Sequence, residues 1–217
     1  STYEDKAYVR APLAWETYHE VDVPGCDAFN VRVQQNNAFY SVAVFVEQVD
    51  ETFLERRSLN PNGALYKLFN GITSSTTGVE KKTRQNENNA DLQAVVAGLT
   101  LGSPNRATFI FDNFDVPEII NYLAAGIISQ DFDRMVKNIY LYRDTEGTRL
   151  WAMYPWDKDL TFGVCALQCD TINGNIDTTA NAPCNNGAKS HPLVGTQARN
   201  FVGHVNNLFD AVYSTPV

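Results

Sequence analysis

Two apolar runs stand close together, Asn138-Ile139-Tyr140-Leu141-Tyr142 and Leu150-Trp151-Ala152-Met153-Tyr154, and are followed by the string Pro155-Trp156-Asp157-Lys158-Asp159-Leu160-Thr161-Phe162-Gly163. Both runs are rich in aromatic and aliphatic residues, and Glu146-Gly147 lies between them. This arrangement predicts a β-hairpin. A hairpin returns the chain to its starting point, so we expect Asp157 to lie next to the residues that precede the first strand.

Polar residues flank both ends of this hairpin. Asp133 and Asn138 form a D-x4-N pattern before it, and Asp157 and Asp159 follow it. Phosphoryl transfer needs a carboxylate that activates the attacking hydroxyl, and oxygen ligands that hold a hard cation such as Mg²⁺. Protein kinases supply these groups in the same order along the chain. The D-x4-N pattern alone is weak, and the two aspartates could instead cap the turn.

A lysine that contacts phosphate is expected from the strands earlier in the chain. Lys67 lies among apolar residues in Leu65-Tyr66-Lys67-Leu68, and an inward-facing lysine there needs an anionic partner. The alternative is an edge-strand lysine that faces solvent. Lys82 is the competing candidate, and Glu47 and Glu80 are candidate partners for either lysine.

Hydrophobic periodicity predicts mostly strands in the first part of the chain and more helices in the second. We expect a helix over residues 5–20, anchored by Tyr8, Leu13, Trp15 and Tyr18, and then a hairpin from residues 29–33 and 41–46 with a turn at residues 34–37 and a buried second strand. A short helix capped by Asp50 and strands over residues 64–69 and 79–83 follow. Later in the chain we expect a helix over residues 90–101, a helix opened by Asp115 and a final helix over residues 198–213. The fold class is therefore α+β, with a small β-rich lobe over residues 1–83 and a more helical lobe over residues 84–217.

Composition bounds the class of protein. The 217 residues are 44% hydrophobic and 19% charged, as in ordinary globular proteins. The chain has 17 Lys and Arg against 25 Asp and Glu, and the resulting net charge of -8 argues against broad nucleic-acid binding. No apolar run reaches the roughly 18 residues that a transmembrane helix needs. The sequence contains neither a P-loop nor a dinucleotide-binding glycine motif.

Cysteine usage suggests the compartment. The four cysteines are Cys26, Cys165, Cys169 and Cys184, and three of them lie in a polar, glycine-rich stretch. This pattern favours disulfides and an oxidising environment. A zinc site completed by His191 and free thiols are the alternatives.

The chain resembles the CotH family of spore-coat and cell-surface kinases. The resemblance is carried by Asp133-Arg134-x-x-Lys137-Asn138-x-Tyr140-x-Tyr142, by Leu150-Trp151 and the Pro155–Gly163 string, and by Phe45–Asp50, Gly63–Lys67 and Val79–Thr83, which follow the family's order. It implies an atypical protein-kinase-like fold, ATP with Mg²⁺ or Mn²⁺ as cofactors, and phosphorylation of Ser or Thr on protein partners. It also implies a secreted protein at a spore or cell surface.

Matched motifs assign a role to each candidate residue. By resemblance, Asp133 would be the catalytic base, Asp157 the main metal ligand and Asn138 a second ligand or an orienter of the site. Lys67 would contact phosphate, although Lys82 also matches a family lysine. Asp159 matches the second aspartate of the metal motif.

Three departures from the family pattern are visible. Phe132 precedes Asp133, so the His-Arg-Asp form of ordinary kinases is missing, and Lys158 occupies a position that the family often fills with an apolar residue. We also expect the family's first strands and final helices to lie outside this chain. Two other functions stay open from the residues alone: a non-catalytic surface adhesion or scaffold module, and an extracellular carbohydrate-active protein that uses paired carboxylates.

Overall fold

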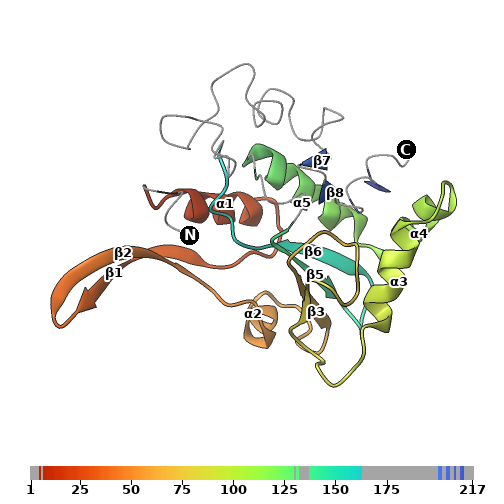
Figure 1. Ribbon diagram of the computed structural model, residues 1–217, viewed down its shortest axis with the longest axis horizontal. Coiled ribbons are helices and arrows are strands. Elements are labelled where there is room, and N and C mark those ends of the chain that lie inside the picture. The colour runs from red at the N-terminus through yellow and green to blue at the C-terminus, as the bar shows by residue number, and fades with distance from the viewer. Residues whose placement is uncertain are drawn as a thin grey trace, which may run out of the picture.

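A four-stranded antiparallel sheet with the strand order β4-β3-β5-β6 lies at the centre of the molecule (Figure 1). The computed structural model describes residues 5, 7–129, 131, 137–162, 200–201, 204–205, 208 and 211–212. In chain order the elements are α1 (Arg10–His19), β1 (Ala28–Gln35), β2 (Ala38–Val46), α2 (Glu51–Arg56), β3 (Ala64–Leu68), β4 (Val79–Lys81), α3 (Ala90–Leu99), α4 (Asn105–Asn113), α5 (Val116–Ile128), β5 (Ile139–Arg143), β6 (Trp151–Pro155), β7 (Asn200–Phe201) and β8 (His204–Val205). The predicted α+β class is confirmed.

The central sheet takes strands from both predicted lobes. β3 and β4 come from residues 1–83, whereas β5 and β6 form the hairpin predicted in residues 84–217. β5 pairs with β3 on one side and with β6 on the other, so Tyr140 lies opposite both Lys67 and Tyr154. The boundary between the lobes stays a prediction.

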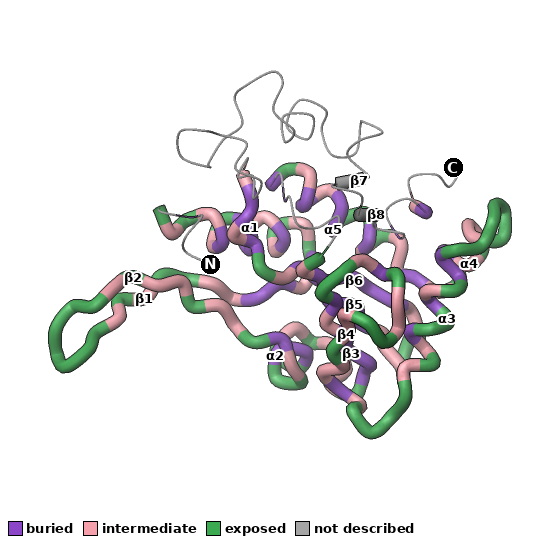
Figure 2. Tube along the Cα trace, in the orientation of Figure 1, coloured by how far each residue is buried: buried purple, intermediate pink, exposed green. Residues whose placement is uncertain are grey.

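Both faces of the central sheet are covered. One face packs against α3, α4 and α5 through Tyr66, Leu68, Ile139, Leu141, Trp151 and Met153. The opposite face packs against Phe53 and Leu54 of α2 and Trp15 of α1, through Leu65, Tyr140, Tyr142, Ala152 and Tyr154. Every residue of β6 is therefore buried, and the hairpin forms the rigid middle layer of the structure (Figure 2).

The strands β1 and β2 form a separate ribbon that projects from this body (Figures 1 and 2). Its turn was predicted correctly: Asn36 and Asn37 both have positive φ, 52° and 63°, as in the turns that suit a two-residue hairpin. The prediction that β2 is buried is wrong, because Phe45 is 47% exposed and Tyr40 is 66% exposed. Among the described residues the ribbon pairs only with itself, and no second sheet covers its apolar residues.

The helices agree with the sequence in position but differ at their ends. α1 begins at Arg10, since Tyr8 has a φ of 57° and the Asp5 carboxylate accepts the Arg10 backbone N–H at 2.7 Å. Trp15 and Tyr18 are buried as predicted, whereas Leu13 is 47% exposed and faces away from the core. Asp50 and Asp115 cap α2 and α5 as predicted, each accepting backbone N–H groups of the first turn.

The end of the chain departs from the predicted helix over residues 198–213. That prediction is wrong at β7 and β8, which pair antiparallel with Phe201 opposite His204. Gly203 lies between the two strands in the sequence, and a glycine inside a helix is destabilising. Leu208 and Ala211 are buried in the same apolar cluster as α5.

Candidate functional site

Strand register brings the predicted ligands to one end of the central sheet. Leu68 pairs with Ile139, which in turn pairs with Pro155. One residue beyond these pairs, the Trp156 backbone N–H donates a hydrogen bond to the Asn138 carbonyl at 3.0 Å. Lys67 on β3, Asn138 before β5 and Asp157 after β6 therefore lie at the same end of the sheet, although they are far apart in the sequence.

Asn138 and Asp157 face each other across the open end of the hairpin. The Asn138 Nδ2 donates to Asp157 Oδ2 at 3.4 Å, and both residues adopt a left-handed backbone with φ of 59° and 53°. Asn and Asp tolerate this region better than other residues with a Cβ. Such backbone conformations are concentrated at functional sites, because the surrounding structure must hold them in place.

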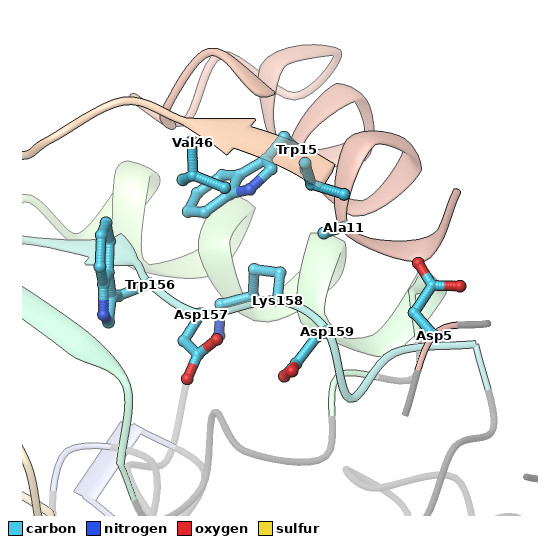
Figure 3. A pocket seen from close by; sticks show the side chains of 9 residues that line it. Asp5, Ala11, Trp15, Val46, Trp156, Asp157, Lys158 and Asp159 are labelled. Atoms are coloured by element: carbon cyan, nitrogen blue, oxygen red, sulfur yellow. The ribbon is translucent and has the colours of Figure 1, made fainter. Parts of the chain in front are cut away.

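Asp157 and Asp159 line a pocket of about 200 Å³. Its other lining residues come from the segment before α1, from α1, from β2 and from the same loop: Asp5, Ala11, Trp15, Val44, Val46, Trp156 and Lys158. Figure 3 shows the carboxylates of Asp157 and Asp159 pointing to the same side of the loop. Burial raises the pKa of Asp159, the nearby Asp157 carboxylate raises it further, and Lys137 partly opposes the shift. A bound cation would stabilise both carboxylates in their charged form.

Lys67 provides a cation beside this loop. Its ammonium lies 4.6 Å from the centre of the Trp156 ring, 5.2 Å from that of Phe69 and 6.0 Å from that of Tyr140. Within the described part of the chain, no carboxylate lies within ion-pair distance of it. The candidate partners lie elsewhere: Glu47 pairs with Arg56, and Glu80 pairs with Lys82 at 3.0 Å. A half-buried lysine held only by aromatic rings is suited to bind an anion.

Lys82 lies away from this end of the sheet. Besides its ion pair with Glu80, it lines a second, polar pocket together with Arg84, Glu87 and Glu146. The structure thus groups Lys67, Asn138, Asp157 and Asp159 and places Lys82 elsewhere. Asp133 lies outside the described residues, as do Cys165, Cys169, Cys184 and His191.

Sequence reasoning missed a buried ionic cluster directly behind the loop. Lys158 Nζ lies 2.6 Å from Asp131 Oδ2, and the two side chains are 0% and 1% exposed. The Tyr18 hydroxyl donates to the same carboxylate oxygen at 2.9 Å. The one available signal was the lysine itself, placed between two aspartates where the family often has an apolar residue. Its partner, Asp131, gave no signal.

The donor set at the end of the sheet fits a hard divalent cation. Asp157 and Asp159 offer carboxylate oxygens, and Asn138 offers its amide oxygen, which are the ligand types that Mg²⁺ prefers. Across the described residues, no group of three His, Cys, Asp or Glu side chains forms a metal cluster. These three residues are therefore candidates to share a cation with further ligands.

Cys26 is buried and its thiol is free. Burial raises the pKa of this thiol to about 12, so it is a structural rather than a reactive cysteine. The predicted disulfides are thus not seen at Cys26, and the other three cysteines lie outside the described residues. Within those residues, no helix is long and apolar enough to span a membrane.

Comparison with known proteins points in the same direction as the geometry. The model of a family described as "CotH kinase protein" matches residues 1–214. The inner spore coat protein H of Bacillus subtilis (strain 168) is 27% identical over 175 residues, which cover 74% of this chain and 48% of that protein. The chain therefore spans about half the length of this relative.

Proposed function

This chain belongs to the CotH kinase protein family, and we propose that it transfers the γ-phosphate of ATP to Ser or Thr hydroxyls of protein substrates, with Mg²⁺ or Mn²⁺. One observation carries the proposal: the sheet register collects Lys67, Asn138, Asp157 and Asp159 at a single end of the sheet. We extend the proposal to an atypical protein-kinase-like fold. Because the relative is named as a spore coat protein, we also place the activity at the spore surface.

Each residue has a definite task in this proposal. Asp133 accepts the proton of the attacking hydroxyl, and Asp157, Asn138 and Asp159 hold the metal. The metal neutralises charge on the phosphate oxygens when it is bound. Lys67 pairs with a phosphate oxygen. Its aromatic surroundings strengthen that attraction, because the local dielectric is lower than that of water.

The pocket beside the loop offers a place for the nucleotide base. Trp15, Val44 and Val46 give the pocket apolar lining, and Trp156 and Asp157, which directly follow β6, also line it. Figure 3 shows Trp15 and Val46 on one side of the loop that carries Asp157. The buried Trp15 Nε1–H has no acceptor in the described residues, so it can donate to a polar atom of a ligand. Apolar walls with few polar groups are typical of small-molecule sites.

Calorimetric titration with ATP and Mn²⁺ tests the metal site. We expect metal-dependent binding to the wild-type chain and its loss in Asp157→Ala, because that variant removes an anionic ligand. Asp112→Ala is the matched control, since Asp112 is an exposed aspartate on α4 and is distant in the sequence from the loop that carries Asp157. Equal binding by the Asp157 and Asp112 variants would contradict the assignment. Absence of binding in all three proteins would favour the non-catalytic surface module.

A paired substitution tests which lysine contacts phosphate. Lys67→Met is expected to weaken ATP binding about 10- to 100-fold, the range for losing a hydrogen bond to a charged group. Lys82→Met should leave the affinity within about twofold, because Lys82 already pairs with Glu80 and lies in another pocket. The reverse result would transfer the role to Lys82.

A further inference from the structure

We propose that Lys158, Asp131 and Tyr18 are positioning residues, which fix the metal-binding loop relative to the segment that leads to Asp133. We refer to these three side chains as the buried ionic cluster. The inference rests on the proposed function, since it concerns how the proposed ligands and the proposed base are kept in register. None of the three residues touches the reacting atoms in this proposal.

The hydrogen bonds of the buried ionic cluster are directional, and its charged atoms are shielded from water. Both the Lys158 and the Asp131 side chains are essentially inaccessible to solvent, and their charged atoms lie 2.6 Å apart. Tyr18 adds a second hydrogen bond, of 2.9 Å, to the same oxygen. Charge-assisted hydrogen bonds of this length hold their partners in a narrow range of distances and angles. Apolar contacts would give no such restraint.

The cluster joins three segments that the reaction needs in register. Lys158 lies between Asp157 and Asp159 in the metal-binding loop (Figure 3). Asp131 precedes Asp133 by two residues in the sequence. Tyr18 belongs to α1, the helix whose Trp15 lines the pocket. One buried carboxylate therefore connects the ligand loop, the chain entering the base and the pocket wall.

Stability alone does not account for this arrangement. A buried ion pair is weak evidence for stability, because replacing both partners by apolar residues is often neutral or stabilising. The loop is also connected to the same region by the backbone, through the Phe162 N–H, which donates to the Ser129 carbonyl. The ion pair additionally fixes the position of Lys158, and with it the positions of Asp157 and Asp159 on either side of it in the sequence.

Three variants separate positioning from stability. Lys158→Met removes the ammonium that pairs with the buried Asp131 carboxylate, and is expected to lower the melting temperature. The triple variant Lys158→Met, Asp131→Leu, Tyr18→Phe removes every polar group of the cluster, and is expected to recover a melting temperature near the wild-type value. Lys81→Met removes a lysine from the exposed end of β4, and is the matched control.

Two readouts are then compared between the wild type and the triple variant. The first, hydrogen exchange of the Phe162 amide, needs no activity, and we expect it to become about tenfold faster when the loop loses its anchor. The second is steady-state kinetics with ATP and Mn²⁺. We expect kcat to fall about 100-fold with KM for ATP within twofold, since a displacement of about 1 Å has a cost of that size.

The outcomes distinguish the two proposals. Unchanged exchange at Phe162 and unchanged kcat in a triple variant of wild-type stability would overturn the positioning role. Faster exchange in a chain whose wild type transfers no phosphate would support the cluster as the anchor of the loop and contradict the proposed kinase activity. Slower turnover that the Lys81→Met control shares would also overturn the inference, because it would not be specific to the cluster.

Discussion

The hairpins β5–β6 and β1–β2 have similar compositions and opposite surroundings. Both are rich in aromatic and aliphatic residues, and both were recognisable as hairpins from the sequence. Yet all of β6 is buried, whereas β2 has no fully buried residue. The difference lies in the neighbours: β5–β6 has a strand partner and helices on both faces, while in the described part of the chain β1–β2 packs against the core through Ala28 and Val46 at its base. Apolar content therefore predicts a strand, but not the number of layers around it.

This contrast has a functional side. The proposed ligands Asn138 and Asp157 extend from the ends of the fully packed hairpin, where packing holds their unusual backbone conformations. The ribbon contributes only Val44 and Val46, close to its base, to the wall of the pocket. The proposed ligands are thus placed at the ends of the packed hairpin, and each of the following predictions tests how sharply the two regions differ.

The largest effect is expected at the packed hairpin. Trp151→Ala should lower the free energy of unfolding by about 3–5 kcal/mol, because the indole is 2% exposed and packs near Tyr66. Chemical denaturation monitored by circular dichroism measures this loss. A loss below about 1 kcal/mol would show that the hairpin is not the middle layer that we describe.

A pH-dependent effect is expected where α5 covers the same hairpin. Burial raises the pKa of Glu118 to about 7, and the Asp115 carboxylate adds to the shift. The folded-state pKa lies above the unfolded value near 4.5, so the stabilisation is complete below pH 4.5 and is lost as the pH rises through 7. Allowing for partial exposure, we expect Glu118→Gln to remove a pH-dependent loss of about 2 kcal/mol.

Denaturation at pH 5 and pH 8 measures this difference. Glu51→Gln, in the first turn of α2, is the matched control. An unaltered profile in Glu118→Gln would show that the carboxyl of Glu118 is hydrated. The ribbon has no acidic residue between Ala28 and Val46, so it adds no carboxylate to this profile.

A smaller and local effect is expected at the tip of the ribbon. Asn37→Ala places an alanine at a φ of 63°, which disfavours the turn by about 1 kcal/mol. Since the residues at the tip are exposed among the described residues, hydrogen exchange should accelerate at the amides of β1 and β2 while the midpoint of global unfolding stays unchanged. A shift of the global midpoint would instead mean that the ribbon and the body unfold as one unit.

The smallest effect is expected for the exposed aromatic pair of the ribbon. The Phe29 and Phe45 rings stack with their centres 4.9 Å apart, on a surface that is about half exposed. Phe45→Ala should cost about 0.5 kcal/mol, the usual size for a cross-strand pair, in the same denaturation assay. A cost as large as that of Trp151→Ala would remove the distinction between the two hairpins.

Local chemistry explains which parts of the fold were predictable. The turns at Asn36-Asn37, the caps Asp50 and Asp115 and the strands of the central sheet depend on residues close in sequence, and they were confirmed. The meeting of Asn138 and Asp157 was also predictable, because a hairpin necessarily brings its own ends together.

The errors concern contacts that sequence proximity does not specify. The exposure of β2 and of Leu13 depends on which other elements pack against them, and the hydrophobic pattern of a segment does not specify its neighbours. The sequence showed Lys158 only as a departure from the family pattern. Its pairing with Asp131 could not be predicted, because the whole β5–β6 hairpin separates the two residues in the sequence. α4 was not predicted, and Lys67 could be separated from Lys82 only once the strand register was known.

The pairing of β3 with β5 also sets the order in which the protein can assemble on the ribosome. Leu68 can pair with Val79 of β4 early, but it must remain without its β5 partner until residues 69–138 have been synthesised and Ile139 has emerged. The ribbon β1–β2 can close as soon as its own turn is made, but the proposed ligands cannot meet before the second half of the chain appears. A nascent chain therefore carries β3 without its β5 partner while residues 69–138 are synthesised, and any truncated product ending before β5 would lack strands β5 and β6 and the proposed ligand Asp157.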